Sequence, residues 1–344
     1  MTEEAPMKAV AYSKSLPISA EDSLVDLVVD KPEPGPRDLR VAVRAISVNP
    51  VDTKVRLRAQ PAPGEPPKIL GYDAAGVVDA VGTAVTLFKP GDEVFYAGSI
   101  KRPGTNSEFH LVDERIVGHK PKTLSFAQAA ALPLTSITAW ELLFDRLGVL
   151  PGKAPDDRAL LVIGGAGGVG SILIQLARRL TALTVIATAS RPETQDWCRK
   201  LGAHHVINHR QPMPEQLKAI GHANVALIAG LTNTEQHYPA IAEIIAPQGK
   251  FALIDNPTTL DANLLKSKAA SIHWELMFTR PSFETPDMIA QHRLLDDVSS
   301  LVDSGVLITT LANEITPINA ANLRRAHEMI ESERSIGKVV LHGW

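Results

Sequence analysis

The sequence contains very little cysteine. Cys198 is the single cysteine among 344 residues, so the chain cannot close a disulfide on itself. A disulfide framework of the kind found in small secreted domains is therefore excluded, and a reducing compartment fits the composition. On an expected helix from Pro192 to Leu201, this lone thiol is most simply a structural or surface residue.

Excess charge and long apolar runs are also missing. The 35 basic and 38 acidic residues leave a formal net charge of −3, without a long basic run. This balance argues against a nucleic-acid partner. No run approaches the length of a membrane span, and Met1–Pro6 lacks the basic start and apolar core of a signal peptide. We therefore expect a cytoplasmic protein with no membrane partner.

A glycine-rich turn in mid-chain is the most informative feature that is present. Residues 164–170 read Gly-Gly-Ala-Gly-Gly-Val-Gly, between an aliphatic run, Ala159–Ile163, and an apolar run with helical spacing, Ile172–Leu180. These flanks are typical of a buried parallel strand and an amphipathic helix. In that setting the G-x-G-x-x-G spacing predicts a dinucleotide whose pyrophosphate lies close to the backbone. The residues expected at this site are Gly165, Gly167, Gly168, Val169 and Gly170.

The end of the next strand indicates which dinucleotide binds. An NAD-preferring site usually has an acidic residue about twenty positions beyond the glycines, on the ribose 2′-hydroxyl. Here the strand Thr184–Thr188 leads into Ala189, Ser190 and Arg191. The planar guanidinium of Arg191 suits a phosphate, and Ser190 adds a small donor. We therefore expect NADPH as the cofactor, the alternative being that Arg191 is a solvated loop residue.

The pattern of expected secondary structure changes along the chain and predicts two domains. Up to about residue 122, short β signals alternate with turn formers, which favours a β-rich domain. From Ala159 the pattern becomes strand, helix, strand, which is typical of a doubly wound parallel sheet and an α/β fold. A further strand is expected at Lys338–Leu341, and we expect it to belong to the first, β-rich domain. We place the β-rich domain at 1–133, completed by 288–344, and the other domain at 134–287.

Residues 271–278 are expected to form the last strand of the parallel sheet. They read Ser-Ile-His-Trp-Glu-Leu-Met-Phe and would leave an apolar edge. Because exposed edges of this kind are usually paired, we expect a homodimer that forms through this strand.

Several segments, in their order and spacing, resemble those of one known family. They are the glycine turn and residues 47–54, 71–78, 90–94 and 134–140. The chain resembles a medium-chain dehydrogenase/reductase of the zinc-independent quinone oxidoreductase branch, in the subgroup catalogued as zinc-type alcohol dehydrogenase-like proteins. The resemblance covers nearly the whole chain. It implies a Rossmann domain and a GroES-like catalytic domain, with the active site between them.

Residue types at the metal positions of this family argue against zinc. A catalytic zinc needs three Cys, His or carboxylate ligands, and a structural zinc usually needs four thiolates. The resemblance puts Asn49 where zinc-dependent members have a cysteine, and Tyr72 where they have a histidine. The local cluster of His204, His205 and His209 is interpreted as structural or solvated. No metal is therefore expected.

The resemblance also implies roles for individual residues. Asn49 is expected beside the nicotinamide and ribose, and Thr138 near the carboxamide. Asp52 and Lys54 follow on the same loop, where the carboxylate could hold the ammonium in place. Lys54 is the first choice for polarising the substrate oxygen, with a surface salt-bridge lysine as the alternative. Tyr72 either donates the proton or fills the space of the lost ligand.

Two later loops are further implied cofactor contacts. Leu231 and Thr232 should pass the adenosine side, and Ile254 and Asp255 should approach the nicotinamide. Both pairs follow parallel strands, whose carboxyl ends bind ligands in open α/β sheets. Ordinary turn chemistry is the alternative for these residues.

The absence of zinc ligands favours one class of substrate. Hydride added to a quinone or an α,β-unsaturated carbonyl moves charge onto a distant oxygen, where a modest donor stabilises it. A saturated alcohol normally needs a Lewis acid or a general base as its hydride departs. We therefore expect an NADPH-dependent reductase of quinones or enones. Two alternatives stay open: an alcohol dehydrogenase of the zinc-type family, and a nonenzymatic NADPH-binding protein.

Overall fold

The computed structural model describes residues 6–344, whose contacts divide the chain into two compact units. Unit 1 contains the residues up to Leu134 together with Phe278–Trp344, and unit 2 is Thr135–Met277. The expected α/β fold, with a β-rich part and a parallel sheet, is confirmed. The domain boundaries 133/134 and 287/288 remain predictions. Among the described residues, no helix has both the length and the apolarity needed to cross a bilayer.

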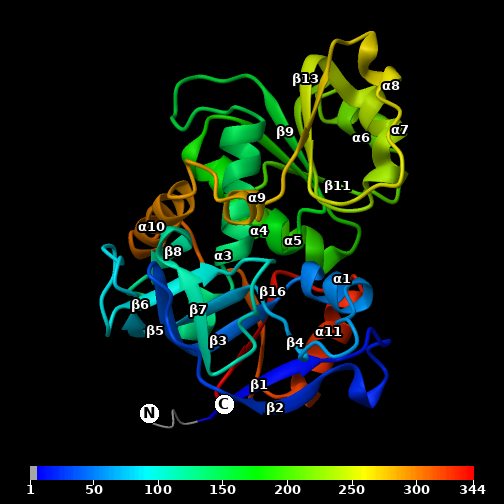
Figure 1. Ribbon diagram of the computed structural model, residues 1–344. Helices are drawn as coiled ribbons and strands as arrows, with labels where there is room; N and C mark the ends of the chain where they lie inside the picture. Colours follow the sequence, from blue (N-terminus) through cyan, green and yellow to red (C-terminus); the bar gives the residue numbers. More distant parts are fainter. Residues whose placement is uncertain (1–5) are drawn as a thin grey trace. The chain divides into compact units, whose positions relative to one another are not determined.

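Unit 1 is built on a seven-stranded sheet and a smaller three-stranded sheet (Figure 1). The larger sheet contains β3 (Asp38–Val48), β5 (Asp73–Val81), β6 (Glu93–Ala97), β7 (Phe109–Asp113), β8 (Val117–His119), β15 (Leu311–Ile315) and β16 (Lys338–His342). Its order is β15-β16-β3-β5-β6-β8, with β7 also paired to β3. The smaller sheet, in the order β2-β1-β4, contains Val25–Val29, Met7–Tyr12 and Lys68–Ile69.

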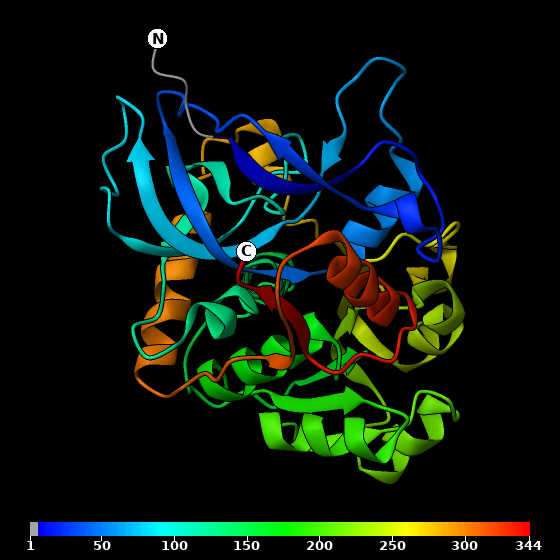
Figure 2. The ribbon, with the colours of Figure 1, turned by 90° about the horizontal axis from the view of Figure 1, so that it is seen from below.

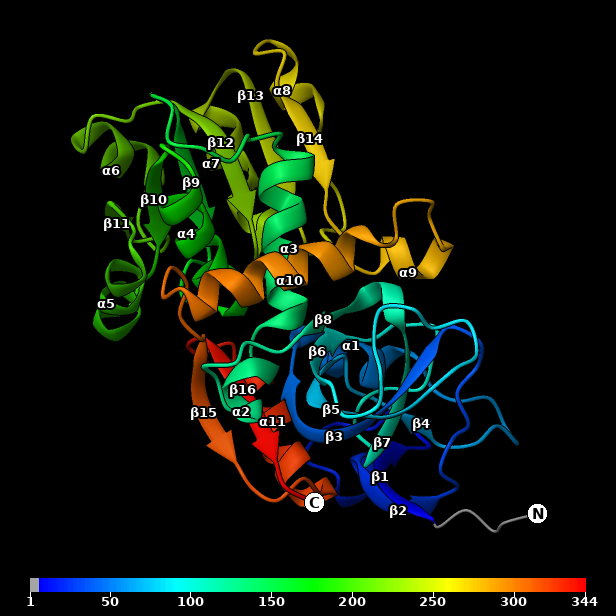
Figure 3. The same cartoon turned by 90° about the vertical axis from the view of Figure 1, so that its left-hand side faces the viewer.

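The long strand β3 organises the larger sheet because its sequence alternates. Leu39, Val41 and Val43 are buried, while the residues between them are partly exposed. This is the pattern of a strand with one face on a core. The last strand of the chain, β16, pairs antiparallel with β3, with Val339 opposite Val48 (Figure 3). The C-terminal strand therefore returns to the β-rich sheet, as expected.

The helices of unit 1 differ in length, and one of them bears directly on the site. They are α1 (Pro50–Arg58), α2 (Phe126–Ala130), α9 (Thr279–Phe283), α10 (Ala290–Asp303) and α11 (Ala320–Glu331), while α3 (Pro133–Trp140) continues into unit 2. Helix α1 packs against α11 (Figure 2). The loop expected for Asp52 and Lys54 was wrong, because α1 already begins at Pro50. Proline at the first helical position has a φ angle suited to the helix and needs no N–H partner.

Unit 2 is a six-stranded parallel sheet in the order β11-β10-β9-β12-β13-β14 (Figure 3). Its strands are β9 (Ala159–Ile163), β10 (Thr184–Thr188), β11 (His205–Ile207), β12 (Val225–Gly230), β13 (Ile245–Leu253) and β14 (Ser271–Trp274). Its other helices are α4 (Gly168–Leu180), α5 (Pro192–Leu201), α6 (Met213–Ala219), α7 (Thr234–Ile244) and α8 (Asn263–Lys266). All five residues of β9 are buried, as expected of a central parallel strand.

One expected element of unit 2 differs from the structure. The expected strand 271–278 is shorter, since β14 ends at Trp274. Helix α3 is followed at Glu141–Arg146 by a π-helical segment. The side chain of Glu275 is buried and accepts a 2.8 Å hydrogen bond from Nε of Arg146. This bond joins the residue that follows β14 to the π-helical segment.

Candidate functional site

The start of α1 gives unit 1 its first candidate group. Asn49 precedes the helix in an extended conformation, and Oδ2 of Asp52 accepts a 2.7 Å hydrogen bond from the backbone N–H of Asn49. A carboxylate three residues after the N-cap position commonly satisfies this donor. The side chain of Asn49 is thereby left to bond elsewhere.

The amide of Asn49 lies in a buried polar cluster. Its Nδ2 donates to Oδ2 of Asp73 at 2.7 Å, and its Oδ1 accepts from Nζ of Lys338. The same Asp73 oxygen accepts from the Ser47 hydroxyl at 2.7 Å, and the other carboxylate oxygen accepts from the Leu134 N–H at 2.7 Å. All four side chains in this cluster, those of Ser47, Asn49, Asp73 and Lys338, are buried. We call these four residues the Asn49 cluster.

Asp52 is a buried titratable group beside this cluster. Burial is the main cause that raises the pKa of its carboxyl to about 7, and the charge of Asp73 acts in the same direction. The N–H of Asn49 and the ammonium of Lys338 act in the opposite direction. A carboxyl that titrates near pH 7 can exchange a proton under physiological conditions.

Lys54 and Tyr72 differ strongly in their surroundings. Lys54 is exposed, and within residues 6–344 no hydrogen bond or ion pair joins it to Asp52, whose carboxylate is buried. Tyr72 is buried with its ring edge-on to Phe278, the centroids 5.1 Å apart. Burial, assisted by the charge of Asp52, raises the pKa of the Tyr72 hydroxyl above its usual value. The phenol therefore stays protonated at neutral pH.

In unit 2, the three motif glycines differ in what an added Cβ would contact. A Cβ on Gly170 would lie 2.5 Å from the carbonyl oxygen of Gly164. A Cβ on Gly165 would lie 2.9 Å from Ala187 Cβ and 3.1 Å from Cys198 Sγ. A Cβ on Gly167 would only reach ordinary contact, 3.6 Å from the Gly164 oxygen. The fold itself therefore requires two of the glycines, whereas Gly167 leaves space beside the backbone.

This turn fits the pyrophosphate of a dinucleotide. Helix α4 begins directly after Gly167, so the N–H groups of Gly168, Val169 and Gly170 lie in its first turn. Such N–H groups have no partner within the helix and attract anions. The space at Gly167 is where a bound phosphate approaches the backbone in folds of this class.

The end of β10 carries hydroxyl and cationic groups instead of a carboxylate. The Thr188 hydroxyl accepts from the Gly164 N–H at 3.0 Å, which ties this strand to the glycine turn. Ser190 is partly buried, and Arg191 precedes α5 with Nε 3.3 Å from Oε1 of Glu193. A guanidinium in this position suits a phosphate.

The remaining predicted contacts fall into two groups. Thr138, on α3, is buried, and Thr232 packs its methyl group 3.0 Å from the Cβ position of Gly164. Asp255, which follows Ile254, accepts from the N–H and hydroxyl of Thr234 at 2.8 and 2.5 Å. Thr232 and its neighbour Leu231 thus lie at the glycine turn, while Asp255 holds the start of α7.

Sequence reasoning missed Ser47, Asp73 and Lys338 as members of the Asn49 cluster. Their contacts connect residues up to 289 positions apart in the chain. Lys338 opens the apolar strand sequence Lys-Val-Val-Leu, which resembles an ordinary strand that starts at the surface. Only its 3% exposure distinguishes it. Lys338 could have been found only by pairing its strand with β3, because that register places the lysine opposite the candidate residue Asn49.

Two histidines of the predicted local cluster and the one cysteine are held by the fold of unit 2. His204 Nδ1 accepts from the Val185 N–H at 2.9 Å, and His209 Nδ1 lies 3.2 Å from the Thr188 hydroxyl. Cys198 is fully buried, and burial raises the pKa of its thiol to about 12. Over residues 6–344, no three His, Cys, Asp or Glu side chains gather in a way that could hold a metal ion.

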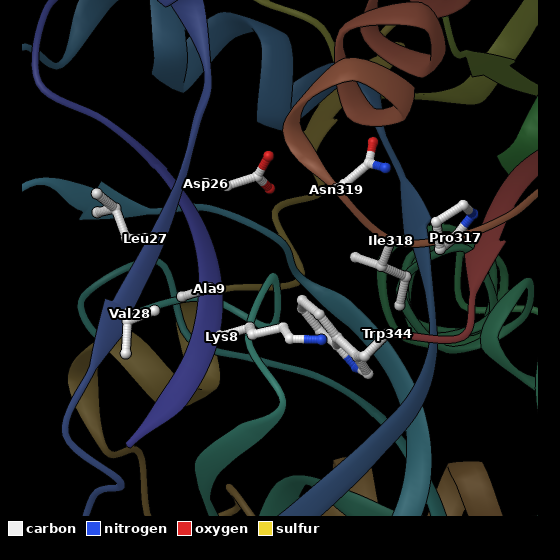
Figure 4. A pocket seen from close by; sticks show the side chains of 9 residues that line it. All are labelled: Lys8, Ala9, Asp26, Leu27, Val28, Pro317, Ile318, Asn319 and Trp344. Atoms are coloured by element: carbon white, nitrogen blue, oxygen red, sulfur yellow. The ribbon is translucent and has the colours of Figure 1, made fainter.

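A separate cavity of about 430 Å³ lies in unit 1 (Figure 4). Its lining residues are Lys8, Ala9, Asp26, Leu27, Val28, Pro317, Ile318, Asn319 and Trp344. None of them belongs to the Asn49 cluster. The Asp26 carboxylate accepts from the Ala320 N–H at 2.9 Å, and the Trp344 indole donates to the Val43 carbonyl at 3.2 Å. These polar groups are thus used by the fold.

Comparison with known proteins gives matches over the whole chain. Residues 35–137 match the family described as alcohol dehydrogenase GroES-like domain, and residues 201–341 match zinc-binding dehydrogenase. A zinc-type alcohol dehydrogenase-like protein of Staphylococcus aureus strain COL is 41% identical over 340 residues, which cover 98% of this chain and 100% of the relative.

Two solved structures extend the comparison. A protein from Rhizobium etli CFN 42, named provisionally as a zinc-dependent alcohol dehydrogenase, is 60% identical with a TM-score of 0.94, over 99% of both chains. The quinone oxidoreductase of Escherichia coli, solved in complex with NADPH, is 26% identical with a TM-score of 0.81, over 97% of this chain and 99% of its own.

Proposed function

Because the chain belongs to the medium-chain dehydrogenase/reductase superfamily of oxidoreductases, we propose that it reduces quinones or α,β-unsaturated carbonyls with NADPH and without zinc. The observation that carries the proposal is the Asn49 cluster. Asn49 stands where the resemblance implies a zinc-binding cysteine, and its amide oxygen already accepts from the ammonium of Lys338. A divalent cation at that oxygen would be repelled by the ammonium beside it.

The rest of the donor set supports the same proposal. Tyr72, at the second ligand position, is a buried phenol whose raised pKa keeps it protonated. A protonated phenol is a poor substitute for the thiolate or imidazole of a zinc site. The names of the S. aureus and R. etli proteins refer to zinc. Those names apply to the two relatives and not to this chain. The residues of this chain favour activation of the substrate by hydrogen bonds and charge.

NADPH is the proposed cofactor, and the E. coli relative solved with NADPH supports this choice. When bound, NADPH supplies the hydride. The first turn of α4 would hold the pyrophosphate, with contacts from Gly165 to Gly170. Ser190 and Arg191 would bind the 2′-phosphate, since the three residues directly after β10 are Ala189, Ser190 and Arg191, without a carboxylate. We further propose Asn49, Thr138, Leu231, Thr232 and Ile254 as neighbours of the cofactor.

Two side chains are candidates to stabilise charge on the substrate oxygen. Lys54 offers an exposed ammonium on α1, and Asp52 does not immobilise it. Tyr72 offers a protonated hydroxyl on a buried ring. A single donor aimed at the developing oxyanion is enough to accelerate addition to a conjugated carbonyl substantially. We propose Lys54 for this role, with Tyr72 as the alternative donor.

Steady-state turnover with a substrate panel tests the proposed reaction. Purified protein is given NADPH with quinones, enones or saturated aldehydes, and NADP⁺ with saturated alcohols. We expect NADPH oxidation with quinones or enones and negligible alcohol oxidation. Turnover confined to the alcohols would replace the proposal with an alcohol dehydrogenase. Tight NADPH binding without turnover of any panel member would favour a nonenzymatic role.

Replacing Arg191 tests the cofactor assignment separately. Arg191→Ala should weaken NADPH binding by roughly 1.5–3 kcal/mol, the range for hydrogen bonds to charged groups, and leave NADH binding nearly unchanged. Arg199→Ala removes a comparable ion-paired arginine from α5 and serves as the control. Equal losses for the two cofactors, measured by fluorescence titration, would contradict the assignment.

We also propose that the protein forms a homodimer through β14. This strand is the edge of the six-stranded sheet, and Trp274 and Leu276 beside it are 55% and 57% exposed. An apolar edge with unpaired backbone groups favours pairing with a second copy. Leu276→Asp should convert the dimer to monomer in sedimentation velocity, whereas Leu264→Asp, on exposed α8, should not. A monomeric native protein would refute this proposal.

A further inference from the structure

Lys338 has no established role, yet its surroundings are unusually well defined. An ammonium group has three N–H donors. In Lys338 these face three acceptors: the Val48 carbonyl at 3.2 Å, Oδ2 of Asp73 at 3.1 Å, and Oδ1 of Asn49. With 3% of the residue exposed, no donor remains for solvent or for a substrate. Lys338 can therefore act only through the groups it holds.

The sheet register brings this cluster together. On β16 and β3, Val339 lies opposite Val48, so Lys338 falls opposite Asn49, one step along the antiparallel ladder. On β3 and β5, Ser47 lies opposite Asp73. The strands β16, β3 and β5 are neighbours in the sheet (Figure 3). Their register brings the ammonium of Lys338, the carboxylate of Asp73 and the amide of Asn49, which directly follows β3, to one end of the sheet. The positions follow from backbone pairing and not from a flexible loop.

We infer that Lys338 is a positioning residue that, together with Asp73, fixes the orientation of the Asn49 side-chain amide. Asp73 accepts hydrogen bonds and Lys338 donates them, so the two ends of the amide face partners of opposite kind. A rotation of the amide by 180° would set its NH₂ group against the ammonium and its oxygen against the carboxylate. Both contacts would be repulsive, so a single orientation is favoured.

The orientation matters because Asn49 is proposed to contact the cofactor, and the inference rests on that proposed function. Misplacement of a positioning group by about 1 Å can cost roughly 100-fold in rate. The same cluster also bears on Asp52, whose carboxyl is influenced by the charges of Lys338 and Asp73 and in turn raises the pKa of Tyr72. Loss of the ammonium should therefore raise the pKa of Asp52 above its value of about 7.

The test compares two buried lysines of unit 1. Lys338→Met removes the ammonium from the cluster, while Lys120→Met removes one that bonds to the Pro121 and Leu124 carbonyls and has no contact with Asn49. With an enone and NADPH, we expect kcat/KM of Lys338→Met to fall roughly 10–100-fold. In the pH profile of kcat/KM for Lys338→Met, the apparent pKa that reports Asp52 should lie above its native value of about 7. Lys120→Met should retain the native profile even where its stability falls.

A second variant addresses the case in which Lys338→Met does not fold. The double variant Asp73→Asn/Lys338→Met removes both charges and leaves no buried charge unpaired. We expect it to fold and still to show the loss of kcat/KM, while the effects of the two lost charges on the pKa of Asp52 oppose each other. Native kcat/KM in either folded variant would overturn the inference. An equal loss in Lys120→Met would overturn it too, because the effect would then be structural.

An additional readout separates this inference from the proposed function. The side-chain NH₂ signals of Asn49, assigned in ¹⁵N NMR spectra by their disappearance in Asn49→Asp, report the amide without any substrate. In the native protein we expect one shifted, slowly exchanging proton from the bond to Asp73, with rapid exchange in the double variant. A fast-exchanging native amide would refute the positioning role even if the enzyme is active. A locked amide in an inactive protein would refute only the proposed function.

Discussion

Units 1 and 2 hold their candidate sites by different physical means. In unit 1, side chains from β3, β5 and β16 form a buried cluster in which every member depends on a partner far away in the sequence. In unit 2, seven consecutive residues shape a backbone turn, and what matters is the absence of side chains. The first site should therefore be sensitive to loss of a charge, and the second to gain of a methyl group.

The largest expected effect is on the charge cluster. Asp73→Ala leaves the Lys338 ammonium buried without its carboxylate, and removing one partner of a buried ion pair costs about 3–5 kcal/mol. Urea unfolding measures this loss. The control, Asp79→Ala on the same strand, breaks partly exposed pairs with Lys31 and Arg40 and should cost under about 1 kcal/mol. Equal losses in the free energy of unfolding would show that Asp73 in the Asn49 cluster stabilises the protein no more than a partly exposed ion pair does.

An exposed charge in the same unit should affect chemistry and not stability. Lys54→Met should lower the single-turnover rate of enone reduction by ~10²–10³-fold, by analogy with the removal of one oxyanion donor. Folding and NADPH affinity should stay native, and Lys89→Met, another exposed lysine of unit 1, should be neutral. If Lys54→Met reacts at the native rate while Tyr72→Phe is slow, the donor is Tyr72.

In unit 2, two alanine substitutions should separate folding from binding. Gly170→Ala forces a Cβ to 2.5 Å from a backbone oxygen and should destabilise the protein by about 1–3 kcal/mol. Gly167→Ala has room within the protein and should unfold like the native chain, but its methyl group should obstruct NADPH. Denaturation and cofactor titration on both variants decide this. Unchanged NADPH affinity in Gly167→Ala would argue against a pyrophosphate at this turn.

The smallest expected effect concerns a buried acid in unit 2. Burial, with the charge of Glu141, raises the pKa of Glu275 to about 9 despite the nearby Arg146. As pH rises from the ordinary carboxyl pKa of 4.5 toward 9, the unfolded chain releases a proton that the folded chain retains, so stability falls. Glu275→Gln should reduce the drop in Tm between pH 6 and pH 8.5 by about 2–4 °C.

The control for this pH effect is Glu243→Gln, which neutralises an exposed acid on α7. It should show the same drop in Tm as the native protein. A Glu275→Gln protein with a native drop would mean that this carboxyl is already ionised in the folded state.

The contrast between the units also explains what could be predicted from sequence. The glycine turn was predicted because its strand, turn and helix follow one another in the chain, and each has a local pattern. The α/β fold and the edge position of the strand near 271 followed from the same local signals. Which residues bind the cofactor stays a prediction.

The Asn49 cluster could not be predicted because it depends on pairing between distant strands. Nothing in the sequence around Asp73 or Lys338 records that the two side chains meet. The same limit applies to Asp52, which was expected to hold Lys54 and instead accepts from the backbone of Asn49. It applies again to Glu275, whose bond to Arg146 accompanies the early end of β14. In each case a tertiary partner overrode the local pattern.

The most direct test of the account is turnover by protein freed of metal. Protein purified without added metal is treated with a chelator, its zinc content is measured, and single-turnover reduction of an enone by NADPH is followed in the same sample. We predict substoichiometric zinc, native folding and an unchanged rate, because the proposed reaction uses no metal ion and the Asn49 amide oxygen already accepts from the Lys338 ammonium. Loss of the reaction on chelation, with recovery on adding one equivalent of zinc, would contradict the account.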